Sequence, residues 1–551
     1  MTTATLAEPA PHRTGHRVTE RSTVMFLTAL AIVALLQVAL VFTKSINWDE
    51  FFHFSEIHAR RAGEPVDWLQ TPYSYLFGFV TRLPGSVIDH IQYTRLLIMP
   101  FEALLVASVV VAARRFVDWG PALAAGLIYL SAGYVFTQAL SLRADIIAAS
   151  LVMAAVAIGL HQPLRPLTLC VIALLCALAF VSTIKILLYL PVVLGVLVVR
   201  RDSVLVAWPV ISGLALASAA LAVFVAMAYP EAPAYLVDKL GRSAARMFGG
   251  DLLPQGRYAV RQIAMAIPFA LVLVAFIPWL VRASATRADR AALALFVLPA
   301  LWPLVYFNAY PYFYAFMLPP VAVGLAPVVA TVIQRYGAMS VAIACALSAI
   351  LLFALEPRDQ LGVQRAFDAE VREIFPRPVR YIDDSGMIGD YPRAVPHYAS
   401  GWALAKYRRA EVAEYRASVL ERPVPLLIAN SQSLALVFDL TGTPNLLLAE
   451  DAEFLRANYL PHGGMIYVAG KRLAPKERLT GELLPTPGTY RVEGGPMSID
   501  DRVLSPGAIV TLSQGRYDFA NLSDTPAALR WAEAGEPRNT DIALRDMFTD
   551  F

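Results

Sequence analysis

The chain has 551 residues, of which 57% are hydrophobic and only 16% are charged, and its mean hydropathy is +0.54. A water-soluble protein of this length needs more charged side chains to cover its surface, so the composition indicates a membrane protein and excludes an ordinary soluble enzyme. The net charge is only +3, and without a basic block the sequence predicts no nucleic-acid partner.

The N-terminal residues 1–22 are polar and are predicted to form a disordered cytoplasmic segment. The apolar run from Thr23 to Phe42 is too long for a cleaved signal peptide, so we expect a retained first span. Ten further apolar runs follow, and together they predict about eleven transmembrane helices within residues 23–355. The ten runs cover residues 92–113, 121–137, 143–160, 166–183, 185–199, 204–228, 262–281, 291–307, 312–334 and 338–355.

Arginines are frequent in the short connections expected on one side of the membrane, and this bias predicts a cytoplasmic N-terminus. They are Arg114, Arg115, Arg165, Arg200, Arg201, Arg282, Arg287, Arg290 and Arg335. An odd number of spans then puts the C-terminal region on the opposite side. We therefore expect a multi-pass protein of the cytoplasmic (inner) membrane with a periplasmic or extracellular C-terminal region.

Beyond about Glu356 the long apolar runs stop, and charged residues, proline and glycine become frequent. Residues 356–479 mix helical stretches with short apolar strands, which predicts a small α/β region. Residues 480–535 alternate short strands with turns and predict a small β module, and residues 536–551 form a C-terminal tail. The expected fold is a polytopic α-helical membrane domain followed by a soluble α/β region and a small β domain.

The first outer loop, residues 44–91, carries Asp49 and Glu50 directly behind the first span. Read as a helix, this segment has Asp49, His53 and Glu56 on one face, at spacings of four and three residues. The neighbouring aromatic residues are expected to hold this helix in the membrane interface. A carboxylate shielded from water at that surface suits a general base that acts on a substrate with a lipid half.

Charged residues near the outer ends of several spans form a second group. They are Arg95 in the second span, Arg143 and Asp145 at the start of the fourth, and Lys185 at the break after the fifth. Charges at membrane depth are costly, so each is either kept for function or neutralised by a neighbour. Taken together with the cations of the outer loop 230–261, they favour a site for a phosphate-bearing lipid. The loop cations are Lys239, Arg242, Arg246, Arg257 and Arg261.

An aromatic cluster, residues 306–314, lies at the outer turn between the ninth and tenth expected spans. Tyr310 lies near its centre. An aromatic belt at the membrane interface and stacking against a sugar both explain the cluster, and the belt is the favoured interpretation.

The order and spacing of these motifs resemble the GT-C glycosyltransferases, in particular the bacterial branch near protein O-mannosyltransferases and the lipid A aminoarabinose transferase. The acidic pair after the first span corresponds to Asp49-Glu50, the Arg-Leu of the second span to Arg95-Leu96, and the Arg-x-Asp of the fourth to Arg143-Ala144-Asp145. A glycine and a Pro-Pro-x-x-Tyr-like stretch correspond to Ala62-Gly63 and to residues 71–75, which include Tyr73 and lack one proline. The resemblance covers roughly residues 23–355.

This resemblance implies transfer of a hexosyl or pentosyl group from a polyprenyl-phosphate carrier to a lipid, glycan or protein acceptor on the outer side of the membrane, with inversion of the anomeric centre. Asp49 is the candidate base, and Glu50 assists it by positioning the acceptor or the cations. The other candidates are Arg95, Arg143, Lys185, Arg242 and Arg246 as phosphate ligands, and His53, Asp145, Tyr73 and Tyr310 as supporting residues. This mechanism requires no cofactor, although Asp49 and His53 are spaced to share a divalent metal ion.

Two other classes of protein are alternatives to a glycosyltransferase. A flippase or transporter of lipid-linked sugars also has many spans and charges at depth, but such proteins tend to have internal repeats, and none is found between the halves of this chain. A membrane anchor for a sugar-binding C-terminal domain does not explain why Asp49, Arg143 and Lys185 are present. Transfer chemistry at the membrane surface therefore ranks first.

Overall fold

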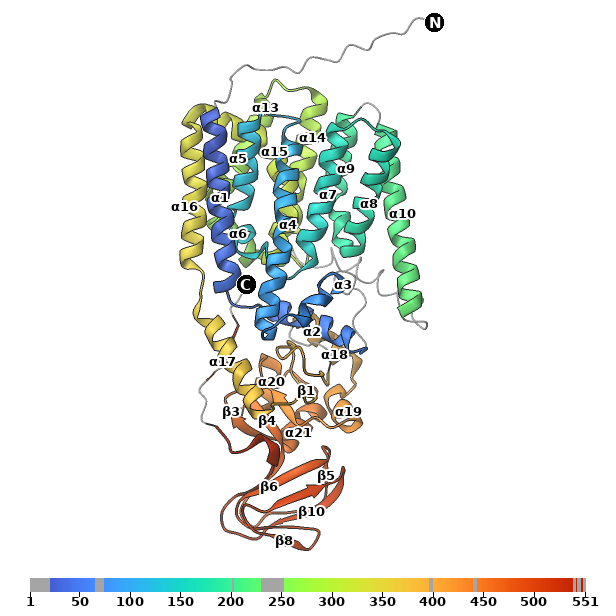
Figure 1. Ribbon diagram of the computed structural model, residues 1–551, viewed down its shortest axis with the longest axis vertical. Helices are drawn as coiled ribbons and strands as arrows, with labels where there is room; N and C mark the ends of the chain where they lie inside the picture. The colour runs from blue at the N-terminus through green and yellow to red at the C-terminus, as the bar shows by residue number, and fades with distance from the viewer. Residues whose placement is uncertain are drawn as a thin grey trace, which may run out of the picture.

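The computed structural model of the chain describes residues 20–64, 74–200, 203–228, 252–395, 400–439, 443–538, 542 and 547–548. Most helices run side by side in a bundle, and the strands gather beyond one end of that bundle (Figure 1). Three expected site residues, Tyr73, Arg242 and Arg246, lie outside the described residues. The first 19 residues of the expected disordered segment do as well, and its last three belong to the first helix.

Each apolar run coincides with one helix or with two consecutive helices. They are α1 (Glu20–Thr43), α4 (Val87–Ala113), α5 (Trp119–Leu130), α6 (Tyr134–Gln138), α7 (Ala144–His161), α8 (Pro166–Ser182), η2 (Ile184–Tyr189), α9 (Leu190–Val199), α10 (Ser203–Ala228), α12 (Gly256–Met265), α13 (Ile267–Arg282), α14 (Arg287–Val297), η3 (Leu298–Leu304), α15 (Pro311–Tyr336) and α16 (Ala338–Leu355). Within the described residues, five helices are long and apolar enough to cross a membrane, or six if the bent pair α12–α13 counts as one span. The protein is thus a multi-pass membrane protein, while the number of eleven spans stays a prediction.

The run 262–281 comprises two helices with a sharp bend between them. Helices α12 and α13 meet at Ala266 with a bend of 100°. Pro268 lies in the first turn of α13 and has no N–H to bond back into α12, so the helix cannot continue through this point. As a consequence, α12 lies across the direction of α13 with its arginines exposed and Gln262 buried.

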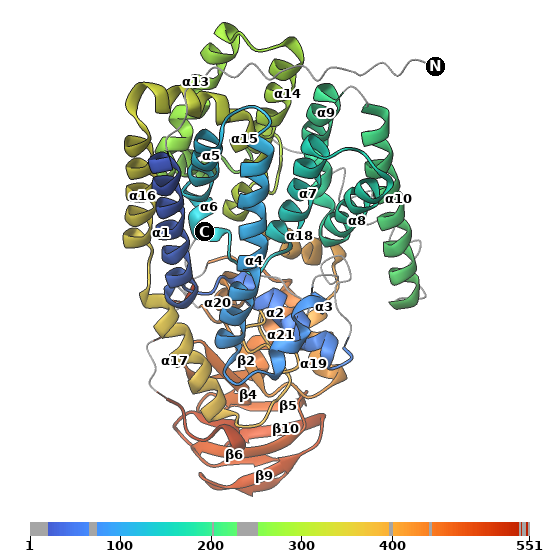
Figure 2. The ribbon, with the colours of Figure 1, turned by 45° about the horizontal axis from the view of Figure 1, so that its top comes forward.

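The loop between α1 and α4 folds into α2 (Trp48–Arg61), α3 (Ser74–Phe77) and η1 (Gly78–Arg82). Helix α2 lies between the bundle and the C-terminal strands (Figures 1 and 2). Its aromatic side chains were expected to meet lipid, yet Phe51 and Phe54 are fully buried and Phe52 is only 8% exposed. The reason is that protein covers both sides of this helix, since Arg393 of the C-terminal region forms an ion pair with Glu56.

The C-terminal region begins with α17 (Asp359–Ile374) and continues as two sheets with helices packed on them. Its other helices are α18 (Gly401–Ala410), α19 (Glu414–Glu421), α20 (Gln432–Phe438), α21 (Ala449–Asn458) and η4 (Ala532–Ala534). Its strands are β1 (Tyr381–Ile382), β2 (Leu426–Ile428), β3 (Tyr459–Gly463), β4 (Ile466–Leu473), β5 (Arg478–Leu484), β6 (Gly488–Gly494), β7 (Met497–Ile499), β8 (Arg502–Leu504), β9 (Ile509–Leu512), β10 (Gly515–Asn521) and β11 (Ala527–Trp531).

The larger sheet has the strand order β1-β2-β4-β11-β6-β9, with β3 also paired to β4, and the smaller sheet has the order β5-β10-β7-β8. Strands β1 and β2 are parallel, whereas β4 and β11 pair antiparallel. Strand β4 precedes residue 480 and β11 follows it, so hydrogen-bonded strands from both sides of the expected boundary share one sheet. The boundary itself stays a prediction.

Gln364 of α17 ties the membrane bundle to the C-terminal region. Its side chain is fully buried, accepts a hydrogen bond from the N–H of Ile46 at 2.9 Å and donates to the Ile46 carbonyl at 2.8 Å. It also donates to the carbonyl of Met547 at 2.8 Å. One amide thus holds the link between α1 and α2, the first helix of the C-terminal region and the last part of the chain together.

We predict that Gln364→Ala lowers the free energy of unfolding by about 2–4 kcal/mol, because buried backbone groups of Ile46 lose their partner. The measurement is the thermal denaturation midpoint of the purified protein in detergent. Gln432→Ala, at an exposed position of α20, is the matched control and is expected to leave the midpoint unchanged. Equal midpoints for the two variants would show that Gln364 does not hold these segments together.

Candidate active site

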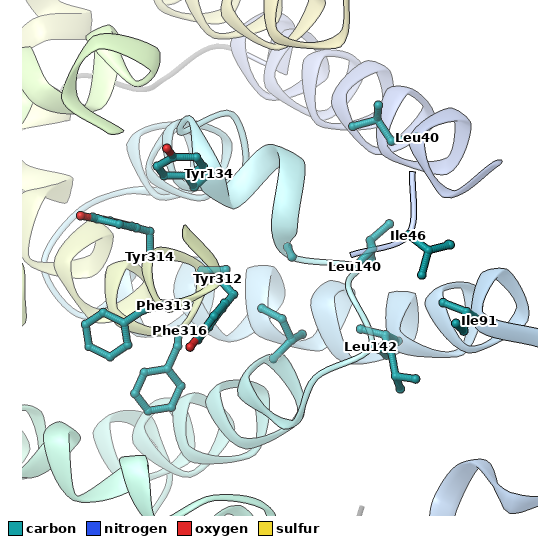
Figure 3. Packing of buried hydrophobic residues seen from close by; sticks show 14 of the residues in the cluster. Leu40, Ile46, Ile91, Tyr134, Leu140, Leu142, Tyr312, Phe313, Tyr314 and Phe316 are labelled. Carbon is teal, nitrogen blue, oxygen red and sulfur yellow. The ribbon is translucent and has the colours of Figure 1, made fainter. Parts of the chain in front are cut away.

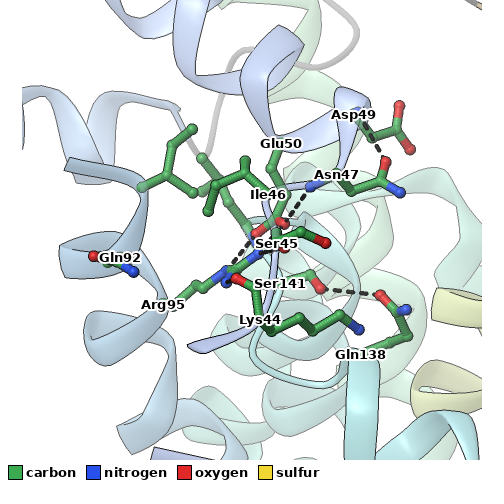
Figure 4. Close-up of polar contacts among 12 residues, drawn as sticks. Lys44, Ser45, Ile46, Asn47, Asp49, Glu50, Gln92, Arg95, Gln138 and Ser141 are labelled. Carbon is green, nitrogen blue, oxygen red and sulfur yellow. Dashed lines mark hydrogen bonds and ion pairs between the residues drawn. The ribbon is translucent and has the colours of Figure 1, made fainter. Parts of the chain in front are cut away.

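Helix α2 begins with a capping box that fixes where its two carboxylates point. The side chain of Asn47 accepts a hydrogen bond from the N–H of Asp49 at 2.9 Å, and the N–H of Asn47 donates to Glu50 Oε2 at 3.2 Å (Figure 4). This reciprocal arrangement satisfies orphan backbone groups at the start of the helix. It directs the Glu50 carboxylate back toward the start of α2, away from the Asp49 carboxylate (Figure 4).

Glu50 forms a buried ion pair with Arg95 of α4. Arg95 Nε donates to Glu50 Oε1 at 2.9 Å, and the N–H of Leu142 donates to the same oxygen at 2.8 Å. Burial acts to raise the pKa of the Glu50 carboxyl, but the charge of Arg95 and these hydrogen bonds outweigh it and hold the pKa below its usual range. The Glu50 carboxylate is therefore ionised, and both of its oxygens accept hydrogen bonds.

Arg95 also donates hydrogen bonds to backbone carbonyl oxygens. Its two terminal nitrogens donate to the carbonyl of Lys44 at 3.1 Å and to the carbonyl of Ser45 at 2.9 Å. The side chain is only 3% exposed. Arg95 was expected to bind a phosphate, but the structure directs its guanidinium to Glu50 and the end of α1, an arrangement that favours a positioning role.

Loss of one member of this pair leaves the other as a buried, uncompensated charge. We predict that Glu50→Leu or Arg95→Met alone lowers the free energy of unfolding by about 3–5 kcal/mol. The double variant is expected to be more stable than either single variant, because it buries no charge. Denaturation midpoints and the yield of folded protein measure the effect, and a double variant no better than the singles would refute it.

Asp49 faces a row of alternating charges from two other segments, the start of α7 and η2. Arg143, which precedes the first residue of α7, forms an ion pair with Asp49 through Nη1 and with Asp145 through Nε, the latter at 3.2 Å. Lys185 of η2 reaches the other oxygen of Asp145 at 2.8 Å. These side chains are between 5% and 16% exposed, so the four charges lie largely screened from solvent. The structure thus brings together four residues that the sequence spreads over more than a hundred positions.

Tyr312 of α15 lies beneath both cations. The Arg143 guanidinium carbon is 3.3 Å from its ring centroid, and Lys185 Nζ is 4.9 Å from it. A cation over an aromatic face is attracted by the ring quadrupole, so Tyr312 holds the two side chains on one side of the site. Sequence analysis missed this residue because it stood within a run of aromatics assigned to the membrane interface.

The belt interpretation is wrong for a large part of the cluster 306–314, because four of its rings are buried in protein. They are Tyr306, Tyr312, Phe313 and Tyr314. Figure 3 shows Tyr312, Phe313, Tyr314 and Phe316 projecting from α15 among the neighbouring helices. Hydropathy cannot separate an aromatic residue that packs against other helices from one that faces lipid.

Tyrosine rings continue from Tyr312 toward α12. Ring centroids are 6.1 Å apart from Tyr312 to Tyr310, 5.8 Å from Tyr310 to Tyr258, and 6.3 Å from Tyr258 to Tyr134. Two exposed arginines of α12 lie along this row. They are Arg257, which donates to the Tyr258 hydroxyl at 2.6 Å, and Arg261, whose guanidinium carbon is 6.0 Å from the Tyr134 ring centroid. The row joins the Asp49 site to the part of the outer loop 230–261 that the structure describes.

His53 follows Asp49 by one helical turn and is buried. Burial, and after it the charge of Arg143, lowers the pKa of His53 to about 3, so the imidazole is neutral at physiological pH. Within the ranges that the structure describes, no group of three or more His, Cys, Asp or Glu side chains is arranged to hold a metal ion. A divalent ion shared by Asp49 and His53 stays a prediction.

Several solved structures are similar to this chain, among them one of ArnT and one of AglB. ArnT from Cupriavidus metallidurans bound to undecaprenyl phosphate has a TM-score of 0.56 at 13% identity, covering 76% of this chain and 95% of ArnT. The archaeal oligosaccharyltransferase AglB from Archaeoglobus fulgidus, in complex with an inhibitory peptide and a dolichol-phosphate, has a TM-score of 0.52 at 11% identity, covering 96% of this chain and all of AglB. Comparison of the sequence with family models and with curated proteins finds no match. The chain therefore has a GT-C-like fold, as the motifs predict.

Proposed function

We propose that the protein is a membrane glycosyltransferase that moves a hexosyl or pentosyl group from a polyprenyl-phosphate donor to an acceptor hydroxyl. The observation that carries this proposal is the carboxylate of Asp49 beside the paired cations Arg143 and Lys185, screened from solvent at one end of an apolar bundle. The likeness to folds that bind undecaprenyl phosphate and dolichol-phosphate supports a lipid-linked donor. The acceptor is a lipid, a glycan or a protein on the periplasmic side of the inner membrane.

In the proposed reaction the acceptor oxygen attacks the anomeric carbon of the donor sugar. The bond from that carbon to the phosphate oxygen breaks, and the polyprenyl phosphate leaves with the bonding electron pair. Asp49 accepts the proton of the acceptor hydroxyl, and the two cations stabilise the negative charge on the departing phosphate. A single displacement of this kind inverts the anomeric centre.

The ion pairs at the site explain how donor binding prepares the base. Arg143 and Lys185 carry two positive charges, which Asp49 and Asp145 balance. A donor phosphate competes with Asp49 for Arg143, because both anions accept charge-assisted hydrogen bonds from a guanidinium. The released Asp49 is then available for the acceptor hydroxyl. Asp145 keeps Lys185 in position.

The remaining candidates have supporting roles in this proposal. Arg257 and Arg261, together with Arg242 and Arg246 of the same outer loop, attract the anionic carrier toward the tyrosine row. Arg95 and Glu50 position the backbone around the site and do not contact the donor. A divalent metal at Asp49 and His53 is an additional proposal, and activity that is lost after chelation and restored by a divalent cation would support it.

We predict that Asp49→Asn reduces sugar transfer at least about a hundredfold, because the acceptor hydroxyl loses its base while the side chain keeps its size. The assay follows release of polyprenyl phosphate and formation of the glycosylated acceptor by purified protein. Asp501→Asn, at an exposed turn of the C-terminal region, is the control and is expected to retain full activity. Full activity of Asp49→Asn would refute the mechanism. A protein that moves the lipid-linked donor across vesicles without releasing polyprenyl phosphate would instead be a flippase.

We predict that Lys185→Met raises the KM for the lipid donor about 10- to 100-fold, because one phosphate ligand is lost. Lys185→Arg is expected to retain most of the affinity, since it preserves the charge. Competitive inhibition by polyprenyl phosphate provides a second measurement and is expected to weaken in parallel. An unchanged KM and inhibition constant in Lys185→Met would exclude Lys185 as a phosphate ligand.

A further inference from the structure

The loop that follows β1, residues 383–393, packs against α2 from the side of the C-terminal region. Its Gly386 has a φ of +74°, and its backbone lies so close to α2 that a Cβ there would come within 2.4 Å of the Ser55 Oγ. A Cβ on Gly389 would lie 3.5 Å from the Cα of Ser55. Glycine at these two positions therefore lets the backbone of the loop contact α2 directly.

Buried hydrogen bonds fix the shape of this loop. Asp383 is fully buried, and its carboxylate accepts hydrogen bonds from the N–H of Gly386 at 2.9 Å and from the N–H of Met387 at 2.8 Å. The N–H of Tyr381 in β1 donates to the carbonyl of Pro392 at 3.0 Å, so the loop returns to the strand from which it departs. A satisfied, buried network of this kind makes the loop a rigid support.

The loop ends in a cation that is paired with α2. Arg393 forms an ion pair with Glu56, and its guanidinium carbon lies 5.5 Å from the ring centroid of Phe52. The side chains of Arg393 and Glu56 are only 14% and 8% exposed, so solvent screens their attraction weakly. The C-terminal region therefore holds α2 both through backbone contact and through charge.

The face of α2 that Arg393 holds is the face that carries the proposed base. Glu56 follows Asp49 by seven residues, which is two helical turns along the same side of the helix. Arg143 at the start of α7 pairs with Asp49, and Arg393 pairs with Glu56. Because a rotation of α2 about its axis moves both carboxylates together, the contact at Glu56 restricts where the Asp49 carboxylate lies.

We propose that the C-terminal region takes part in sugar transfer by positioning α2, with Arg393 and Gly386 as positioning residues for Asp49. This proposal rests on the proposed function, in which Asp49 is the base. Both residues act through α2 and not on the reacting atoms. A displacement of about 1 Å at a reacting group can reduce the rate about a hundredfold, so a small shift of α2 is enough to matter.

The first test is Arg393→Met, which removes the cation and keeps a long side chain. We expect kcat to fall about 10- to 100-fold while the KM for the lipid donor stays unchanged, because Arg143 and Lys185 still bind the phosphate. Arg393→Lys is expected to retain most of kcat, since it preserves the charge. Each kcat is referred to the amount of folded protein, taken from binding of polyprenyl phosphate.

A double variant covers the case in which the single one does not fold. Arg393→Met leaves the Glu56 carboxylate buried without its cation, whereas Glu56→Leu together with Arg393→Met buries no charge. We expect the double variant to fold and to keep the low kcat. Arg416→Met is the matched control, because it removes a solvent-exposed ion pair with Glu450 elsewhere in the C-terminal region, and is expected to retain full kcat.

Gly386→Ala and Gly535→Ala separate contact with α2 from backbone strain. The two glycines have nearly the same φ, +74° and +75°, so an alanine is strained to a similar extent at both. Within the described residues, no atom lies within 4 Å of a Cβ added at Gly535, whereas a Cβ at Gly386 meets Ser55. We expect kcat to fall at least about tenfold in Gly386→Ala and to stay unchanged in Gly535→Ala.

A distance measurement tests the positioning without any transfer reaction. Spin labels are attached through Ala62→Cys, directly after α2, and Tyr336→Cys, at the end of α15, in a chain whose three native cysteines are replaced by alanine. We expect electron–electron double resonance to give a narrow distance distribution in the otherwise unchanged chain and in Arg416→Met. A broadened or shifted distribution is expected in Gly386→Ala and in the double variant of Glu56 and Arg393.

Unchanged distances in Gly386→Ala and the double variant would overturn the proposal, as would an unchanged kcat in both. A raised KM for the lipid donor with an unchanged kcat in Arg393→Met would assign Arg393 to donor binding and overturn it as well. Full activity of Asp49→Asn would instead overturn the proposed function, and the distance distributions would still decide whether the loop holds α2.

Discussion

The buried ion pair between Glu50 and Arg95 is the constraint on which the geometry of the site depends. Glu50 accepts a hydrogen bond from the N–H of Leu142, and Arg95 donates hydrogen bonds to carbonyls of the residues that follow α1. Asp49 is the neighbour of Glu50 in the chain, and Arg143 is the neighbour of Leu142. Fixing Glu50 against Leu142 therefore fixes Asp49 against Arg143. A pair to which no chemical step is assigned thus sets the distance between the two groups to which chemistry is assigned.

The features that were predictable from the sequence are those that depend on local pattern. Apolar runs of sufficient length predict the helices, because unpaired backbone groups cannot be exposed to lipid. The acidic pair behind the first helix predicts α2 and the position of Asp49 at its start. Arg143 and Lys185 were expected to share a site because isolated charges at membrane depth are costly, and the structure joins them through Asp145.

The residues that a side chain or strand contacts depend on tertiary packing, and they could not be predicted in this way. Arg95 has the same sequence context as a phosphate ligand, and only the fold shows that Glu50 engages it. Tyr312 could not be distinguished from its aromatic neighbours, because hydropathy gives the same value for a ring against lipid and a ring under a guanidinium. The pairing of β4 with β11 joins segments more than fifty residues apart, and no local signal sets that register.

The last described residues of the chain return to the helix that carries Asp49. The ring of Phe548 lies 6.1 Å from that of Phe51 in an edge-to-face arrangement, and Met547 is fully buried beside Gln364. During synthesis on the ribosome, α2 emerges long before these two residues. One wall around α2 is therefore completed only after residues 547 and 548 have been synthesised.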